Sequence, residues 1–131
     1  TVHPMLSNQG KGAAVQAGFK LAQAKHFTHA LQVDADGQHT LTDIPRFIDA
    51  MKKSPEALIL GDPIFDAGIP AIRKHGRKLT KAIVALETGA LNLPDAMCGF
   101  RIYPLHPISK LSRQGSRMSF DPDVMVRAYW A

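Results

Sequence analysis

The chain has 131 residues, of which 45% are hydrophobic and 21% are charged, and its net charge is +5. This length and composition fit one packed domain over residues 1–131 and exclude a disordered chain. The single cysteine, Cys98, excludes an internal disulfide and indicates a reducing, cytoplasmic environment. No apolar run reaches the roughly 18 residues of a membrane span, so we expect any membrane contact to be peripheral, at the inner face.

Helical and strand-like patterns alternate along the chain. In chain order, they predict a helix over 12–25, a strand over 29–34, a helix over 43–53, a strand over 57–61, a helix over 70–88, a strand over 100–103 and a last helix from about Pro122. Two helices have an expected buried side, formed by Ile44, Phe47, Ile48 and Met51 in one and by Ile72, Leu79, Ile83 and Leu86 in the other.

The alternation predicts the fold class. Strands separated by helices imply right-handed crossovers, and therefore an α/β fold with a mainly parallel sheet flanked by helices. Such sheets bind ligands at the carboxyl ends of their strands, which is where Asp34 and Asp36 lie in this pattern. Because the chain opens on a helix, we expect an N-terminal βα portion of the fold to be absent. The uncovered sheet edge would favour pairing with a second copy of the chain, giving a homo-oligomer.

The acidic turn, "DADGQH" over 34–39, suggests a metal site. Two carboxylates about 4 Å apart repel each other by roughly 4 kcal/mol at an effective dielectric constant near 20. A cation between Asp34 and Asp36 would relieve this repulsion, and hard oxygen ligands, with Gln38 adding a carbonyl oxygen, favour Mg²⁺ or Mn²⁺. The alternative is a solvated Asp-rich turn. An EF-hand loop is excluded, because His39 and Pro45 occupy its glycine and glutamate places.

Basic residues form a second group of candidates. Glycines around Lys11 would let the backbone approach a ligand at the start of a helix, where anions are favoured. The helix from Pro70 places Arg73, Arg77 and Lys81 on one face. Arg73, nearest the start of that helix, is a candidate contact for a diphosphate or an anionic acceptor. The alternative for both segments is an ordinary solvated surface.

Five segments in order carry a resemblance to a known family. They are "NQGKGAAVQAGFKLA", "LQVDADGQHTLTDIP", "GDPIFD", "RKHGRKLT" and "DAMCGFRIYPL". Together they resemble a family 2 glycosyltransferase of the GT-A fold, and most closely its polyprenyl-phosphate sugar synthase branch. The resemblance covers about residues 8–104. In that branch the second predicted strand is followed by Gly-Ser-Arg, whereas this chain has Asp62 and Pro63 after Gly61.

The resemblance implies a donor, a metal and a set of site residues. The donor would be a nucleotide-diphosphate sugar, and Asp34, Asp36 and Gln38 would hold Mg²⁺ or Mn²⁺ against its diphosphate. Lys11 and Arg73 would face the donor phosphates, and Arg101 would either hold phosphate too or pair with Asp95.

The resemblance also concerns the acceptor, which stays open between a lipid phosphate and a saccharide hydroxyl. Asp95 would lie near it. A hydroxyl acceptor needs a general base, for which Asp95 is the candidate, whereas a phosphate acceptor needs no strong base.

Two other functions compete with this hypothesis. The first is a non-catalytic interaction or regulatory domain of the same fold. The second is a nucleic-acid-binding module, which the sequence disfavours because its few aromatic residues are not interleaved with Lys and Arg. We therefore expect no nucleic-acid partner.

Overall fold

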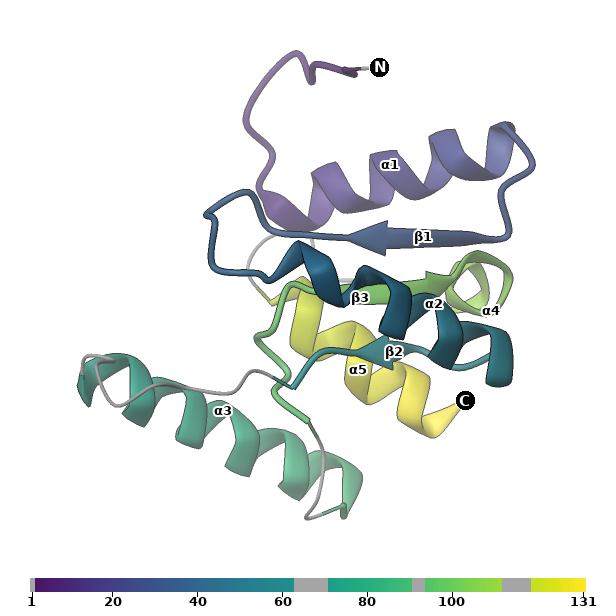
Figure 1. Ribbon diagram of the computed structural model, residues 1–131. Helices are drawn as coiled ribbons and strands as arrows, with labels where there is room; N and C mark the ends of the chain where they lie inside the picture. The colour runs from purple at the N-terminus through teal and green to yellow at the C-terminus, as the bar shows by residue number, and fades with distance from the viewer. Residues whose placement is uncertain (1, 63–70, 91–93, 112–118) are drawn as a thin grey trace.

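The computed structural model describes residues 2–62, 71–90, 94–111 and 119–131, and over 71–79 it describes the helix without its side chains. The elements are α1 (Lys11–Ala24), β1 (His29–Gln32), the 3₁₀ turn η1 (Leu41–Asp43), α2 (Ile44–Lys53), β2 (Ile59–Leu60), α3 (Ala71–Thr88), β3 (Arg101–Pro104), α4 (Leu105–Lys110) and α5 (Phe120–Trp130) (Figure 1). Each predicted helix and strand is present within a few residues. The short α4 was not predicted.

The described strands form one sheet in the order β1-β3-β2. The α/β class is confirmed, but the prediction of a mainly parallel sheet is wrong for these strands, because β3 pairs antiparallel with both neighbours. The connection explains the difference. Gly61, just after β2, donates its N–H to the Phe100 carbonyl just before β3, so the chain re-enters the sheet at the end where it left. α3 packs on α5 instead of running back along the sheet, and β3 therefore points the opposite way (Figure 1).

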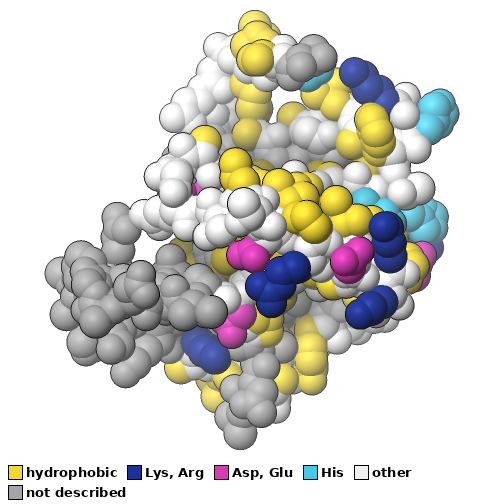
Figure 2. All heavy atoms as spheres, in the orientation of Figure 1, with side chains coloured by type: hydrophobic (Ala, Val, Ile, Leu, Met, Phe, Trp, Pro, Cys, Tyr) yellow, Lys and Arg dark blue, Asp and Glu magenta, His cyan; other side chains and the backbone are white. Residues whose placement is uncertain are grey.

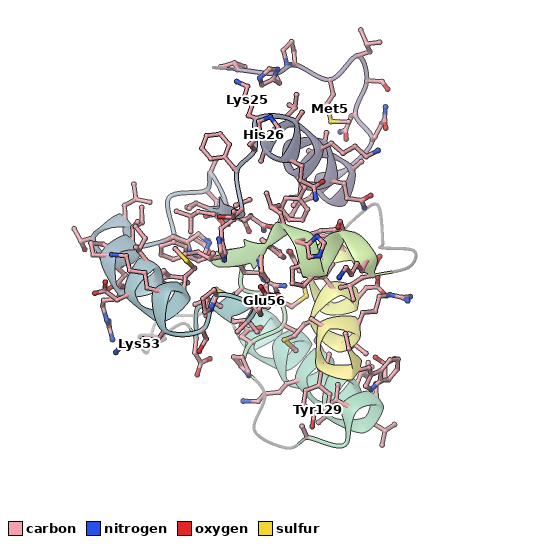
Figure 3. The ribbon with its side chains drawn as sticks, turned by 90° about the vertical axis from the view of Figure 1, so that its right-hand side faces the viewer. Met5, Lys25, His26, Lys53, Glu56 and Tyr129 are labelled. Atoms are coloured by element: carbon pink, nitrogen blue, oxygen red, sulfur yellow. The ribbon has the colours of Figure 1, made fainter. Side chains whose placement is uncertain are left out.

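Helices cover both faces of the sheet, with α2 on one side and α5 on the other (Figure 3). The larger core cluster joins α1, β3, α4 and α5 through Phe19, Tyr103, Leu105, Ile108, Phe120 and Val124. The rings of Phe19 and Tyr103 lie 4.8 Å apart, centroid to centroid. This packing fixes α1 and the start of α5 relative to the sheet.

The apolar sides of α2 and α3 differ from the prediction. Ile48 on α2 is exposed, and Ile83 and Leu86 on α3 are 49% and 87% exposed, although all three were expected to face inward. Val84 is the residue of α3 that joins a core cluster, with Met125 of α5. Ile72 and Leu79 lie outside the described side chains. α3 therefore presents to α5 a side that its sequence pattern did not indicate.

Hydrophobic side chains gather on the surface near β1, above a band of charged side chains on α2 (Figure 2). Exposed residues of this kind include Phe27, Leu31, Leu41 and Ile48. Among the helices of the described ranges, none has the length and apolar character needed to cross a membrane.

Candidate functional site

Three element ends meet at one end of the sheet, at the left of Figure 1. Lys11 is the first residue of α1, Asp34 follows β1 by two residues, and Asp121 lies in the first turn of α5. The Lys11 Nζ atom lies 2.8 Å from Oδ2 of Asp34 and 2.6 Å from Oδ2 of Asp121. A single ammonium group thus bridges two carboxylates that are distant in the sequence.

Lys11 reaches this place because of the local backbone. Gly10 has φ of +89°, a left-handed conformation that glycine adopts without strain, and it directly precedes α1. Its N–H donates to Oδ1 of Asn8 at 3.0 Å. The "NQGKG" segment therefore sets where the helix starts, and with it the origin of the Lys11 side chain.

Asp121 is held by a buried polar network. Its side chain is 5% exposed. Gln32 donates its Nε2 to Oδ1 of Asp121 at 3.4 Å, while the Tyr103 hydroxyl donates to Oε1 of Gln32 at 2.9 Å. Buried polar groups persist when they are hydrogen-bonded in this way, so Asp121 is a fixed anion at the inner side of the site.

Arg101 supports the same network from beneath. It is fully buried, and its guanidinium donates to the backbone carbonyls of Cys98 (Nε, 2.6 Å), Asp121 (Nη1, 2.8 Å) and Ala96 (Nη2). The Nη1 atom also lies 3.9 Å from Oδ1 of Asp121. This geometry gives Arg101 a structural role, which differs from the diphosphate contact expected from the sequence.

Among the described groups, Lys11 and Tyr103 have displaced pKa values. Burial of the Lys11 ammonium opposes its protonation, but the hydrogen bonds to Asp121 and Asp34 outweigh it, and the pKa of Lys11 is raised. Burial of the Tyr103 phenol raises its pKa well above the ordinary value. Lys11 therefore stays charged and Tyr103 stays neutral throughout the physiological range.

Gly99 provides the space in which the Asp34 side chain lies. A side-chain carbon placed on Gly99 would overlap the Asp34 carboxyl group. The reason for glycine here is close approach rather than a left-handed backbone. Gly99 therefore determines where the first acid of the acidic turn can lie.

The rest of the acidic turn is open to solvent. Asp36 and Gln38 are exposed, and the Gln38 N–H donates to Oδ1 of Asp36 at 3.1 Å. Asp95 belongs to a different turn, before β3, where its Oδ1 accepts the N–H of Met97 at 2.8 Å. Arg73 lies in the part of α3 whose side chains are outside the description.

A cavity of about 560 Å³ opens beside the acidic turn. Gln38 and His39 line it from that turn, and Asp62 lines it from the end of β2. Its apolar side includes Phe47 and Phe100, whose rings stack with centroids 4.2 Å apart. It offers an aromatic surface beside polar groups, next to the acids.

Comparison with known proteins identifies the family of the chain. Residues 4–111 match the model of the family described as Glycosyl transferase family 2. The chain belongs to glycosyl transferase family 2. The family 2 domain is 30% identical over 131 residues to a dolichyl-phosphate beta-glucosyltransferase of Trichomonas vaginalis, covering 92% of the chain and 39% of the relative. It is 26% identical over 119 residues to the Saccharomyces cerevisiae dolichyl-phosphate beta-glucosyltransferase, covering 79% of the chain and 35% of the relative.

These relatives confirm the resemblance to polyprenyl-phosphate sugar synthases that the sequence motifs indicated. A second Trichomonas vaginalis protein of the same description is 29% identical over 137 residues, which cover 92% of the chain and 38% of that protein. The family 2 domain thus spans between a third and two fifths of the length of these curated relatives.

The predicted ligand set of the family 2 domain can be tested against metal chemistry. Within the described ranges, no three His, Cys, Asp or Glu side chains gather closely enough to hold an ion by themselves. Asp34, Asp36 and the Gln38 carbonyl are nevertheless hard oxygen donors, and Mg²⁺ and Mn²⁺ commonly complete such partial sets with water and substrate phosphate. The donor chemistry fits, provided that Lys11 releases Oδ2 of Asp34.

Sequence reasoning missed two site residues in the family 2 domain. Asp121 was not singled out, because an acid near a helix start usually reflects the helix dipole. Gly99 carried a signal in the segment "CGF", since a glycine beside a strand often marks a close approach of backbone. Neither pattern reveals its partner, because the partner comes from another element.

Proposed function

We propose that this protein transfers glucose from a nucleotide-diphosphate sugar to the phosphate of a polyprenyl lipid, with Mg²⁺ or Mn²⁺ as its cofactor. The family membership supports sugar transfer, and the names of the relatives support glucose and a lipid-phosphate acceptor. The observation that carries the proposal is the meeting of Lys11 with the acidic turn at the carboxyl end of β1.

Electrostatics supports a donor diphosphate held together with a cation. Asp34 and Asp36 alone would repel a diphosphate, so an anionic donor at this end of the sheet needs positive charge. Lys11 supplies one such charge. A divalent cation held by Asp34, Asp36 and Gln38 would supply the rest and would stabilise the charge that develops on the leaving nucleotide diphosphate. Arg73 remains a proposed additional phosphate contact.

The cavity provides space for the transferred sugar or for the reacting end of the acceptor. Phe47 and Phe100 give the cavity an apolar wall, and Gln38 and His39 line it with hydrogen-bonding groups. The cavity adjoins the acidic turn, so a group bound there would lie beside the diphosphate.

The lipid acceptor brings with it a membrane surface. We propose that the protein meets this surface peripherally, at its cytoplasmic face, where the net charge of +5 favours anionic lipid.

The nature of the acceptor decides the role of Asp95. A phosphate is already anionic at neutral pH, whereas a saccharide hydroxyl must lose a proton during transfer. Asp95→Asn keeps an oxygen that can accept the Met97 N–H, so the turn should survive. With a lipid-phosphate acceptor we expect the variant to lose less than about 10-fold in rate, whereas loss of a general base costs about 10²- to 10⁴-fold.

The direct test is transfer by the full-length protein. Nucleotide-diphosphate glucoses with different bases would be supplied with Mn²⁺, and with either dolichyl phosphate or a saccharide as acceptor. We expect metal-dependent formation of a glucosylated lipid phosphate, and Asp36→Asn should abolish it. Transfer to the saccharide but not to dolichyl phosphate would overturn the proposed lipid-phosphate acceptor. No transfer, together with no Mn²⁺-dependent nucleotide binding, would favour a non-catalytic domain of the same fold.

A further inference from the structure

Lys11 is shared between two acids in different surroundings. The Asp121 side chain is 5% exposed, whereas the Asp34 side chain is 29% exposed. The ammonium lies at the boundary between them, with 23% of the Lys11 side chain exposed. One partner of the lysine therefore belongs to the protein interior, and the other faces the solvent side of the site.

The two acids also differ in how firmly they are held. Asp121 belongs to α5 and lies within hydrogen-bonding distance of Gln32 and the Tyr103 hydroxyl, at 3.4 and 3.5 Å. Asp34 lies in the loop after β1, and its Oδ2 accepts a hydrogen bond from Lys11. An exchange of partners is therefore easier at Asp34 than at Asp121.

We infer that Asp121 is a positioning residue that keeps Lys11 in the site as an exchangeable counter-ion. Lys11 neutralises Asp34 until a divalent cation takes that carboxylate. Asp121 then retains the ammonium beside the donor diphosphate. This inference rests on the proposed function, because it needs both a metal and an anionic donor.

The physical reason lies in the cost of an unpaired charge. A half-buried ammonium that loses its only partner is left poorly solvated, and this cost would oppose metal binding. A lysine with two carboxylate partners can release one and remain paired. Its four-carbon stem and compact charge allow the small shift, whereas the planar guanidinium of arginine would hold a fixed geometry.

The test measures binding of Mn²⁺ alone and of inorganic pyrophosphate with Mn²⁺, by calorimetry on the full-length protein. Lys11→Met frees the Asp34 carboxylate, so we expect Mn²⁺ to bind about 3- to 10-fold tighter. The same variant should bind pyrophosphate more weakly, because a phosphate contact is lost. Structural damage would weaken the binding of both Mn²⁺ and pyrophosphate. A gain in Mn²⁺ affinity together with a loss in pyrophosphate affinity therefore identifies the exchange.

The role of Asp121 is tested by a double-mutant cycle. Among the described residues, Asp121→Asn leaves Lys11 with Asp34 as its acidic partner, so Mn²⁺ should bind about 10-fold more weakly. In the Lys11→Met background the loss should fall to about 2- to 3-fold, the effect of the charge alone. Asp123→Asn is the matched control. It removes a charge from the same turn of α5, where Asp123 pairs with Arg127 at 2.8 Å, and should change the Mn²⁺ affinity by less than about twofold.

Each outcome decides something. Equal losses in the two backgrounds, or a Lys11→Met protein that binds Mn²⁺ no tighter than wild type, would overturn this inference while the proposed function stands. Absence of Mn²⁺ binding in both wild type and Lys11→Met would overturn the metal role together with the exchange. If a thermal melt shows that Asp121→Asn does not fold, the test rests on Lys11→Met alone. Tighter Mn²⁺ binding together with weaker pyrophosphate binding in that variant would still support the exchange.

Discussion

Among single residues, Gly99 gives the clearest test of a position that matters for binding more than for stability. Gly99→Ala places a methyl group where the Asp34 carboxyl group lies. The side chain of Asp34 can rotate away, so we expect a loss of stability of less than about 1 kcal/mol. The turned carboxylate would no longer meet Lys11 or a cation. Calorimetry should therefore show at least about a 10-fold loss of Mn²⁺-dependent nucleotide affinity, while the thermal midpoint stays nearly constant.

Gly18→Ala is the matched control for this substitution. Gly18 lies in α1, and a side-chain carbon there meets nothing within 4 Å. Alanine in a helix interior is favoured over glycine by about 0.5–1 kcal/mol, so Gly18→Ala should stabilise the protein and leave binding unchanged. If both variants lost nucleotide affinity equally, the role given to Gly99 would be wrong.

The Tyr103 hydroxyl links the core to the site. Tyr103→Phe removes the donor to Oε1 of Gln32 and leaves that buried oxygen without this hydrogen bond, so we expect a loss of about 1–2 kcal/mol in the free energy of unfolding. Denaturant unfolding measures this loss. Tyr129→Phe, at an exposed tyrosine near the end of α5, should change the stability by less than about 0.5 kcal/mol.

Tyr103 also predicts an alkaline limit on stability. Its pKa is raised in the folded protein, so the folded state holds the phenolic proton more tightly than the unfolded chain does. This contribution to stability is complete below the pKa of an unfolded tyrosine and declines as the pH rises above it. Unfolding measured across alkaline pH should show a decline that Tyr103→Phe reduces. An identical decline in the variant would assign it to other groups.

At the residue scale, the sequence indicated the acids and the lysine but not their partners. Asp34, Asp36 and Lys11 stood in segments whose composition already suggested ligands. Asp121 did not, since its role depends on α5 packing beside α1. For Arg101 the sequence left both a phosphate contact and an ion pair open, and its burial beside Asp121 favours the ion pair. Contacts made across the fold decide which charged groups face the site.

α2 offers a test at the scale of an element. No residue of this helix is fully buried, and Phe47 joins it to the sheet by stacking on Phe100 at 4.2 Å. Phe47→Ala should cost about 1–3 kcal/mol of stability and raise amide exchange along α2 and the acidic turn before it. Hydrogen exchange with mass spectrometry measures both segments.

The neighbouring position serves as the control for α2. Ile48 was expected to face inward but is 36% exposed, so Ile48→Ala should cost less than half as much as Phe47→Ala. Equal costs, with unchanged exchange in the acidic turn, would show that α2 does not support the site.

Elements were predicted better than their arrangement. Local periodicity was enough to place α1 and α3, and Gly89, with φ of +70°, follows α3 as expected for a helix C-cap. The direction of β3 could not be read in the same way, because it depends on where the chain re-enters the sheet. The prediction of which side of α3 faces inward was wrong for a related reason. α3 packs on α5 rather than on the sheet, and among its described side chains only Val84 is buried.

At the scale of the molecule, β1 forms one edge of the described sheet. Among the described strands, β1 pairs with β3 on one side alone, and hydrophobic side chains gather on the surface nearby (Figure 2). Unpaired backbone donors and acceptors along a strand can pair with another chain. We therefore expect the 131-residue unit, produced by itself, to associate through this edge.

Leu31→Lys tests the association, because a lysine on an edge strand disfavours pairing between sheets by charge repulsion. Leu31 lies in the middle of β1, opposite Ile102, and is 41% exposed, so the change should cost little stability. Sedimentation velocity over a concentration series should show the wild-type unit growing beyond a monomer and Leu31→Lys shifting towards the monomer. Leu86→Lys adds the same charge at an 87% exposed leucine on α3 and should leave the association unchanged. A wild-type unit that stays monomeric at high concentration would contradict pairing through β1, and equal effects of the two lysines would point to general charge repulsion instead.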